Sequence, residues 1–174
     1  KMIKGVDFYK YCFDKISAYP SVELVYGEIT SLSRSGKKFT VSIDGETKIL
    51  DAGFVFNSIV QPDRSEKKNI QLLQHFKGWV IETDNDTFNT EVATMMDFRV
   101  PQNNGTTFAY VLPFDKRTAL IEYTLFTREL LSQAEYDAGL NLYIQDYLGL
   151  KNYRVTETEF GIIPMTSRRF YFEE

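Results

Sequence analysis

The sequence predicts an α+β protein, in which a mixed or antiparallel sheet of about five to seven strands is backed by a helix. Short segments rich in aromatic and β-branched residues follow one another along the chain, with turn residues between them. Only two segments have the three- and four-residue apolar spacing of an amphipathic helix. The 14 Phe and 11 Tyr among 174 residues suit the core of a strand-rich protein.

The first third of the chain predicts a helix followed by a small antiparallel meander. The helix is indicated by Val6, Tyr9, Phe13 and Ile16, and Pro20 closes the pattern. The expected strands are residues 22–26, 29–34, 38–43 and 46–52, with turns at 35–36 and 44–45. Asp-Gly at 44–45 is a strong hairpin signal. Residues 53–58 form a nearly all-apolar run, which predicts a strand covered on both faces.

The rest of the chain begins after a polar, Pro-containing crossover at residues 61–69. We expect strands at 70–83 (interrupted near Gly78), at 90–100 and at 153–163. A central hairpin pairs residues 107–114 with 118–126 around the polar turn at 115–117. The helix at 132–148 starts with the capping box Ser132 and Glu135 and stops at Gly149.

Composition excludes several classes of function. A formal charge of −4 gives no basic surface for nucleic acid. A single cysteine, Cys12, excludes an internal disulfide and fits a reducing compartment. His75 is the only histidine, so we expect no metal site and interpret His75 as a packed or hydrogen-bonded residue of its strand. No G-x-G-x-x-G or Walker A loop is present. Because the chain opens on Lys1 and stops within FYFEE, we expect it to be a piece of a longer protein.

Glu122 is the main candidate for chemistry. On a strand, alternate side chains share a face, so Leu120, Glu122 and Thr124 point together, whereas Ile121 and Tyr123 point away. The pattern leaves two alternatives: Glu122 faces solvent, or it is buried. Burial would disfavour the charged form and raise its pKa, and a protonated carboxyl is a proton donor.

Ordered motifs along the chain resemble the lycopene cyclase family. They are QHFKGWVIE at 74–82, MDFRVPQ at 96–102, FAYVLP at 108–113, LIEYT at 120–124 and FGIIPM at 160–165. KGVDFY at 4–9 and FVFNS at 54–58 are also similar to the family. The resemblance therefore extends over essentially the whole chain.

The resemblance implies a flavoprotein that closes the ψ-ends of lycopene, or of a related carotenoid, into β-rings. The net reaction is an isomerisation, although the family uses reduced FAD, with NAD(P)H as a possible reductant. By this resemblance, residues 1–60 are a partial FAD-domain segment, a Rossmann-like remnant, and residues 61–174 are an antiparallel-sheet substrate domain. The full-length protein is expected in the cytoplasm, peripheral to the membrane. The fragment alone is expected to bind no FAD and to be inactive.

The resemblance also assigns roles to residues. Glu122 is the acid or the stabiliser of a cation, and Asp97, at the family's M-D position, orients it. Family members often carry a second acidic residue after the Glu, where this chain has Tyr123, so the role of a carboxylate pair stays open. Aromatic faces stabilise a desolvated cation by about 1–2 kcal/mol each. The expected substrate-binding residues are Trp79, Phe108, Tyr110, Tyr123 and Phe126, the alternative being that they only pack the sheet; no cofactor-binding residue is identified.

Two other classes of function stay open. One is the substrate domain of another FAD-dependent oxidoreductase, a monooxygenase or an isoprenoid reductase, in which Glu122 need not be an acid. The other is a non-catalytic module that binds a lipid or a protein partner through its aromatic residues.

Overall fold

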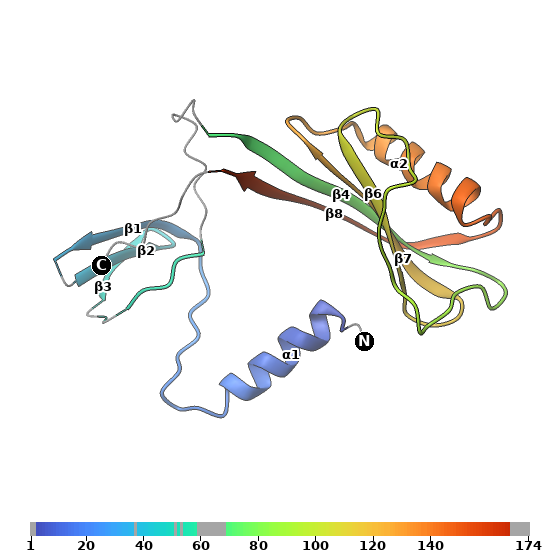
Figure 1. Cartoon of the computed structure of the whole chain (residues 1–174). Helices are drawn as coiled ribbons and strands as arrows, with labels where there is room; N and C mark the ends of the chain where they lie inside the picture. Colours follow the sequence, from blue (N-terminus) through green and yellow to red (C-terminus); the bar gives the residue numbers. More distant parts are fainter. Residues whose placement is uncertain (1–2, 37, 51, 53, 59–68, 168–174) are drawn as a thin grey trace. The chain divides into compact units, whose positions relative to one another are not determined.

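The computed structural model describes residues 3–36, 38–50, 52, 54–58 and 69–167. The chain divides into two compact units, Lys1–Gln61 and Pro62–Glu174, each of which is described by itself (Figure 1). The predicted boundary at residues 61–69 falls almost entirely outside the described residues. No helix in the described part of the chain combines the length and the hydropathy needed to cross a membrane.

The described residues of the first unit form one helix and a three-stranded antiparallel sheet. The helix α1 spans Gly5–Ile16, and the strands β1 (Ile29–Ser35), β2 (Lys38–Ile43) and β3 (Glu46–Leu50) follow in sheet order. The hairpin between β2 and β3 turns at Asp44 and Gly45, whose φ angles of 52° and 82° are those of a type I′ turn. The predicted helix, meander and Asp-Gly turn are therefore confirmed.

Two predicted strands of this unit are wrong. Residues 22–26 form no strand, and residues 54–58 form none either. The side chains of Phe54 and Phe56 are 86% and 95% exposed, respectively. An apolar run shows that a segment can be buried, but a strand also needs a neighbouring backbone with which to form hydrogen bonds. The same limit applies to α1: it forms as predicted, yet none of its residues is buried.

The second unit is a five-stranded antiparallel sheet with a helix on one face (Figure 1). The strands are β4 (Gln71–Glu82), β5 (Thr94–Asp97), β6 (Thr106–Pro113), β7 (Thr118–Thr127) and β8 (Arg154–Thr166), in the order β5-β6-β7-β4-β8. The predicted α+β class with an antiparallel sheet is confirmed; the Rossmann remnant stays a prediction.

Strand lengths differ from the prediction at two places. β4 runs through Gly78 without a break, because Gly78 pairs with Glu122 on one side and with Glu159 on the other. By contrast, the strand predicted at 90–100 is reduced to Thr94–Asp97. Met96 there has a φ of 50°, and the register shifts between Thr94 and Asp97. Such a bulge ends regular pairing after a few residues.

The covering helix α2 (Gln133–Leu142) begins at the predicted capping box. The Ser132 side chain accepts a hydrogen bond from the Glu135 backbone N–H, and the Glu135 carboxylate accepts one from the Ser132 N–H at 2.7 Å. The last turn, η1 (Tyr143–Tyr147), is a π-helix, and Gly149 follows at a φ of 68°. The predicted start and stop signals therefore operate as expected, although the α-helix itself ends earlier.

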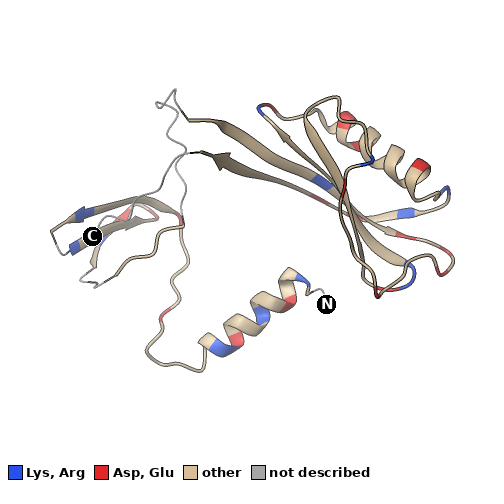
Figure 2. Ribbon diagram, in the orientation of Figure 1, with Lys and Arg blue, Asp and Glu red and all other residues tan. Residues whose placement is uncertain are grey.

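The two faces of the sheet have different surroundings. The helix face carries Ile121, Tyr123 and Leu125 of β7, which pack with Tyr136 and Leu140 of α2 in the buried core. The opposite face, here called the outer face, is defined by the register of the strands. Its residues are Phe76, Gly78 and Val80 of β4, Phe108, Tyr110 and Leu112 of β6, Leu120, Glu122, Thr124 and Phe126 of β7, and Glu157, Glu159 and Gly161 of β8. Figure 2 shows the strands as mostly uncharged ribbon, with many of the charged residues at the turns and on α2.

Candidate active site

The candidate site is a row of four residues that crosses the outer face. Glu122 of β7 pairs with Tyr110 of β6 on one side and with Gly78 of β4 on the other. Gly78 in turn pairs with Glu159 of β8. Paired residues of adjacent strands project to the same face. The row Tyr110–Glu122–Gly78–Glu159 therefore holds two carboxyl groups separated by a residue without a side chain.

Glu122 is half-buried, and its surroundings favour the protonated form. Burial is the main cause that raises its pKa, and the negative charge of Glu159 raises it further. The hydroxyl of Thr124 donates a hydrogen bond of 2.7 Å to Glu122 Oε1, and this hydrogen bond lowers the pKa of Glu122. Of the two alternatives left by the sequence, the structure shows neither outright, because Glu122 lies on the face opposite α2 and is half-buried there. The catalytic role of Glu122 stays a prediction.

Glu159 is the residue of this row that the sequence did not single out. A Cβ atom added to Gly78 would lie 2.8 Å from both Cγ and Oε1 of Glu159, and 3.0 Å from Leu120 Cδ1. The Glu159 side chain thus lies across Gly78, on the side toward Glu122. Although Glu159 is exposed as a residue, the partial desolvation of its carboxyl group raises its pKa, and the charge of Glu157 adds to this.

Aromatic side chains of the outer face surround one end of the row. The ring of Phe108, which is 1% exposed, lies 5.4 Å from that of Tyr110 and 5.7 Å from that of Phe126, measured between centroids. Phe98, in the loop before β6, adds a ring 5.3 Å from Phe108. Three of the expected substrate-binding residues, Phe108, Tyr110 and Phe126, are therefore grouped on the face of Glu122. Phe98 was not among the expected substrate-binding residues, and it lies in the part of the predicted strand 90–100 that follows the end of β5.

The other two expected substrate-binding residues lie on the helix face. Trp79 is paired with Ile121 and packs against the helix-covered core. Tyr123 is 9% exposed and packs against α2, so closely that a Cβ on Gly139 would lie 2.6 Å from its Cε1 atom. Their contacts in this structure are those of core residues.

Asp97 is also on the helix face rather than beside Glu122. It pairs with the buried Ala109, and its carboxylate forms an ion pair with Arg99 at 2.5 Å. The hydroxyl of Tyr143 donates a further hydrogen bond of 2.9 Å to Asp97 Oδ2. The hydrogen bonds from Arg99 hold the pKa of Asp97 well below its usual range. These contacts fix the loop after β5 against η1, and none of them joins Asp97 to Glu122.

His75 is a fully buried residue of the helix face. One of its ring nitrogens, Nδ1, lies 2.5 Å from the hydroxyl of Tyr136, and the other, Nε2, lies 2.7 Å from that of Thr127. Burial lowers its pKa. This agrees with the interpretation of His75 as a packed, hydrogen-bonded residue. No group of three or more potential metal ligands occurs in the described ranges.

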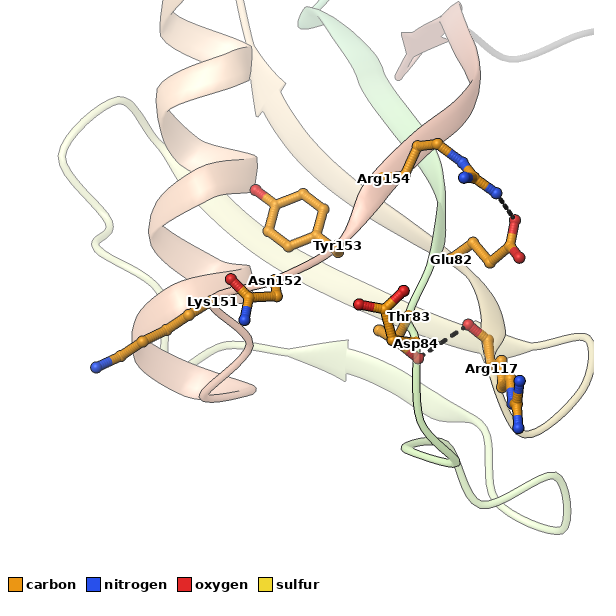
Figure 3. Close-up of a pocket in the computed structure, with 8 residues that line it drawn as sticks. All are labelled: Glu82, Thr83, Asp84, Arg117, Lys151, Asn152, Tyr153 and Arg154. Atoms are coloured by element: carbon orange, nitrogen blue, oxygen red, sulfur yellow. Dashed lines mark hydrogen bonds and ion pairs between the residues drawn. The ribbon is translucent and has the colours of Figure 1, made fainter.

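A polar pocket of about 550 Å³ lies at the end of the sheet where β4 ends and β8 begins (Figure 3). It is lined by Glu82, Thr83, Asp84, Arg117, Lys151, Asn152, Tyr153 and Arg154. Arg154 and Glu82 form an ion pair across its rim at 2.6 Å. The pocket is lined by none of the residues of the Glu122 row, and its charged rim is unsuited to a polyene.

The described residues do not fit the dinucleotide part of a flavin. Such a cofactor places its pyrophosphate at the start of a helix, on a glycine-rich turn that follows a strand. α2 begins at Ser132 with a capping box whose own side chains take up the first backbone donors. The residues directly before α1, Ile3 and Lys4, are not a glycine-rich turn.

Comparison with known proteins found similarity to a family model and to curated plant proteins. A family model described as "Lycopene cyclase protein" matches residues 13–172. A protein of Solanum lycopersicum named "Neoxanthin synthase, chloroplastic" is 29% identical over 142 residues, which are 75% of this chain and 27% of that protein. The protein of the same name from Solanum tuberosum is 28% identical over the same length. The chain thus spans about a quarter of the length of these curated relatives.

Proposed function

The chain belongs to the lycopene cyclase family, and from this premise we propose that the full-length protein closes the ψ-ends of lycopene, or of a related carotenoid, into β-rings. Glu122 is the acid that starts the reaction. The observation that carries this proposal is a half-buried carboxyl group with a raised pKa, on an apolar sheet face beside a group of aromatic rings.

The chemistry requires a proton donor in a dry environment. The carboxylic acid of Glu122 gives its proton to the terminal double bond, whose electron pair forms the new C–H bond and leaves a carbocation and a carboxylate. A second double bond of the polyene then supplies the pair for the C–C bond of the ring. Transfer of a proton from a ring carbon to a base then restores a double bond and balances the proton taken from Glu122, so that the reaction as a whole is an isomerisation.

The aromatic residues support this chemistry in two ways. Phe108, Tyr110 and Phe126 offer apolar surface to a hydrocarbon chain next to the acid. Their ring faces can also stabilise a cation by about 1–2 kcal/mol each once water is excluded. The reduced FAD that the family resemblance implies stays part of the proposal for the full-length protein, with its dinucleotide held by residues other than those described.

The test is expression of the full-length gene in bacteria that accumulate lycopene, followed by identification of the pigment. We expect a product with one or two β-rings. Recovery of lycopene alone, from cells in which the folded protein is present, would contradict the proposal.

A second candidate follows from the names of the relatives, which are called neoxanthin synthases. In this case the full-length protein forms neoxanthin instead of closing the ends of lycopene. Expression of the full-length gene in plant cells that lack neoxanthin distinguishes the two. Neoxanthin recovered from those cells, with lycopene left unchanged in the first experiment, favours the second candidate.

A further inference from the structure

We propose that Glu159 is a positioning residue for the acid: its carboxylate, held over Gly78 beside Glu122, carries the negative charge of the pair and so keeps the proton on Glu122. This inference rests on the proposed function, and it adds to that function a second carboxyl group from a distant part of the sequence.

The geometry depends on Gly78. Neighbouring strands are about 4.8 Å apart, so the side chains of Glu122 and Glu159, which lie one strand beyond Gly78 on either side, are normally separated by the side chain between them. Gly78 has none, and the Glu159 side chain occupies the space, with Cγ and Oε1 each 2.8 Å from where a Cβ would be. The missing side chain thus lets the two carboxyl groups approach each other.

Two carboxyl groups at close range do not both ionise easily, because the second charge is repelled by the first. The more buried group of such a pair keeps its proton, since loss of solvent penalises its charge more strongly. Glu122 is half-buried whereas Glu159 is exposed. The proton therefore stays on Glu122, which is the group next to the aromatic rings.

The other groups around Glu122 do not replace Glu159 in this role. Tyr110 is uncharged, and Thr124 donates a hydrogen bond that favours ionised Glu122. Glu157 precedes Glu159 on the same face of β8, but it pairs with Val80 rather than with Gly78. Lys77, next to Gly78 in β4, points to the helix face, where its ammonium group lies 2.5 Å from Asp137 Oδ1.

The experiment measures the protonation of Glu122 in the full-length gene product by infrared spectroscopy across a pH titration. The C=O band that disappears in Glu122→Gln identifies the protonated Glu122. In Glu159→Gln we expect the midpoint of this band to move to lower pH by about one pH unit. Glu159→Asp keeps the charge and should retain most of the wild-type midpoint.

Glu157→Gln is the matched control, because it removes a carboxylate from the same strand and the same face. It should leave the Glu122 midpoint unchanged or slightly higher, since Glu159 then ionises more readily. The proposal is overturned if Glu159→Gln has the wild-type midpoint, or if Glu157→Gln lowers the midpoint equally. The midpoint is read without turnover, so a protein that cyclises no carotenoid would contradict the proposed function and leave this result intact.

If the proposed function holds, the pH–rate profile gives a second measurement. The activity of Glu159→Gln should decline about one pH unit earlier on the alkaline side, so that at a pH above both midpoints the rate is about tenfold lower than that of the wild type. A change in KM alone, with an unshifted profile, would assign Glu159 to substrate binding and overturn its role in holding the proton.

Discussion

Gly139→Ala tests the assignment of the two sheet faces, because this glycine lets α2 approach Tyr123. The new Cβ would lie 2.6 Å from Tyr123 Cε1 and 2.7 Å from Cζ. Carbon atoms in contact are normally about 3.5–4.0 Å apart, so helix and ring would have to separate by about 1 Å. Alanine is the better helix former by about 1 kcal/mol, whereas overpacking of this kind costs about 1–3 kcal/mol.

The net effect should be a loss of up to about 2 kcal/mol, and the assay is hydrogen exchange of the full-length gene product followed by mass spectrometry. Peptides from β7 and α2 should exchange faster than in the wild type, by up to about 30-fold. In a Tyr123→Ala background the ring is absent, and the same substitution at Gly139 should slow exchange. If Gly139→Ala slows exchange in both backgrounds, Tyr123 does not pack under α2, and the assignment of the faces is refuted.

Three further predictions concern the folded chain. Burial raises the pKa of Glu122, so the free energy of unfolding should fall as the pH rises from about 4.5 toward the folded-state pKa. Glu122→Gln lacks this pH dependence, and in urea denaturation it should be more stable than the wild type at neutral pH. The pKa of Asp97 is lowered, so its effect on stability has the opposite pH dependence: the stabilisation is present above about pH 3.8 and is lost as the pH falls below that value. Asp97→Asn should therefore lower the free energy of unfolding by about 1–3 kcal/mol at pH 7 and by progressively less in acid. Ser132→Ala removes the capping box with Glu135 and should cost about 1 kcal/mol, seen as faster exchange in the first turn of α2, while an unchanged rate there would count against the cap.

Local patterns predicted the elements whose formation is decided locally. The start of α2 follows from the reciprocal hydrogen bonds of Ser132 and Glu135, which lie three residues apart. The turn between β6 and β7 follows from Asp115, whose carboxylate accepts hydrogen bonds from the backbone N–H groups of Arg117 and Thr118 at 2.7 and 2.8 Å. The α+β class could be inferred because such elements succeed one another in a strand-rich order.

The candidate site was only half predictable, because it depends on pairing between distant segments. The two-residue period of a strand predicted that Glu122 and Tyr123 point to opposite faces of the sheet, but it did not say which of the two faces α2 would cover. Glu159 reaches the site only because β4 pairs with both β7 and β8, and nothing within β8 specifies that register. The sequence did contain one signal for Glu159: Glu157 and Glu159 lie two residues apart in the last predicted strand, so both were expected on one face of it.

The errors in the first unit have a related cause. Residues 54–58 have the composition of a buried strand, yet Phe54 and Phe56 are exposed and have no described strand beside them. In the second unit, the family resemblance gave Asp97 the role of orienting Glu122. The bulge at Met96 and the contact with Tyr143 place Asp97 on the other face of the sheet, and its role stays a prediction.

The central claim is that Glu122 supplies the proton, and the most direct measurement is the rate of carotenoid cyclisation by the full-length Glu122→Gln enzyme. Glutamine keeps the shape of the side chain and removes the acid, so the rate should fall by about 10²–10⁴-fold with the fold intact. Glu91→Gln, which changes an exposed carboxylate in the turn before β5, is the control and should retain the wild-type rate. A Glu122→Gln enzyme that forms β-rings at the wild-type rate would contradict the account.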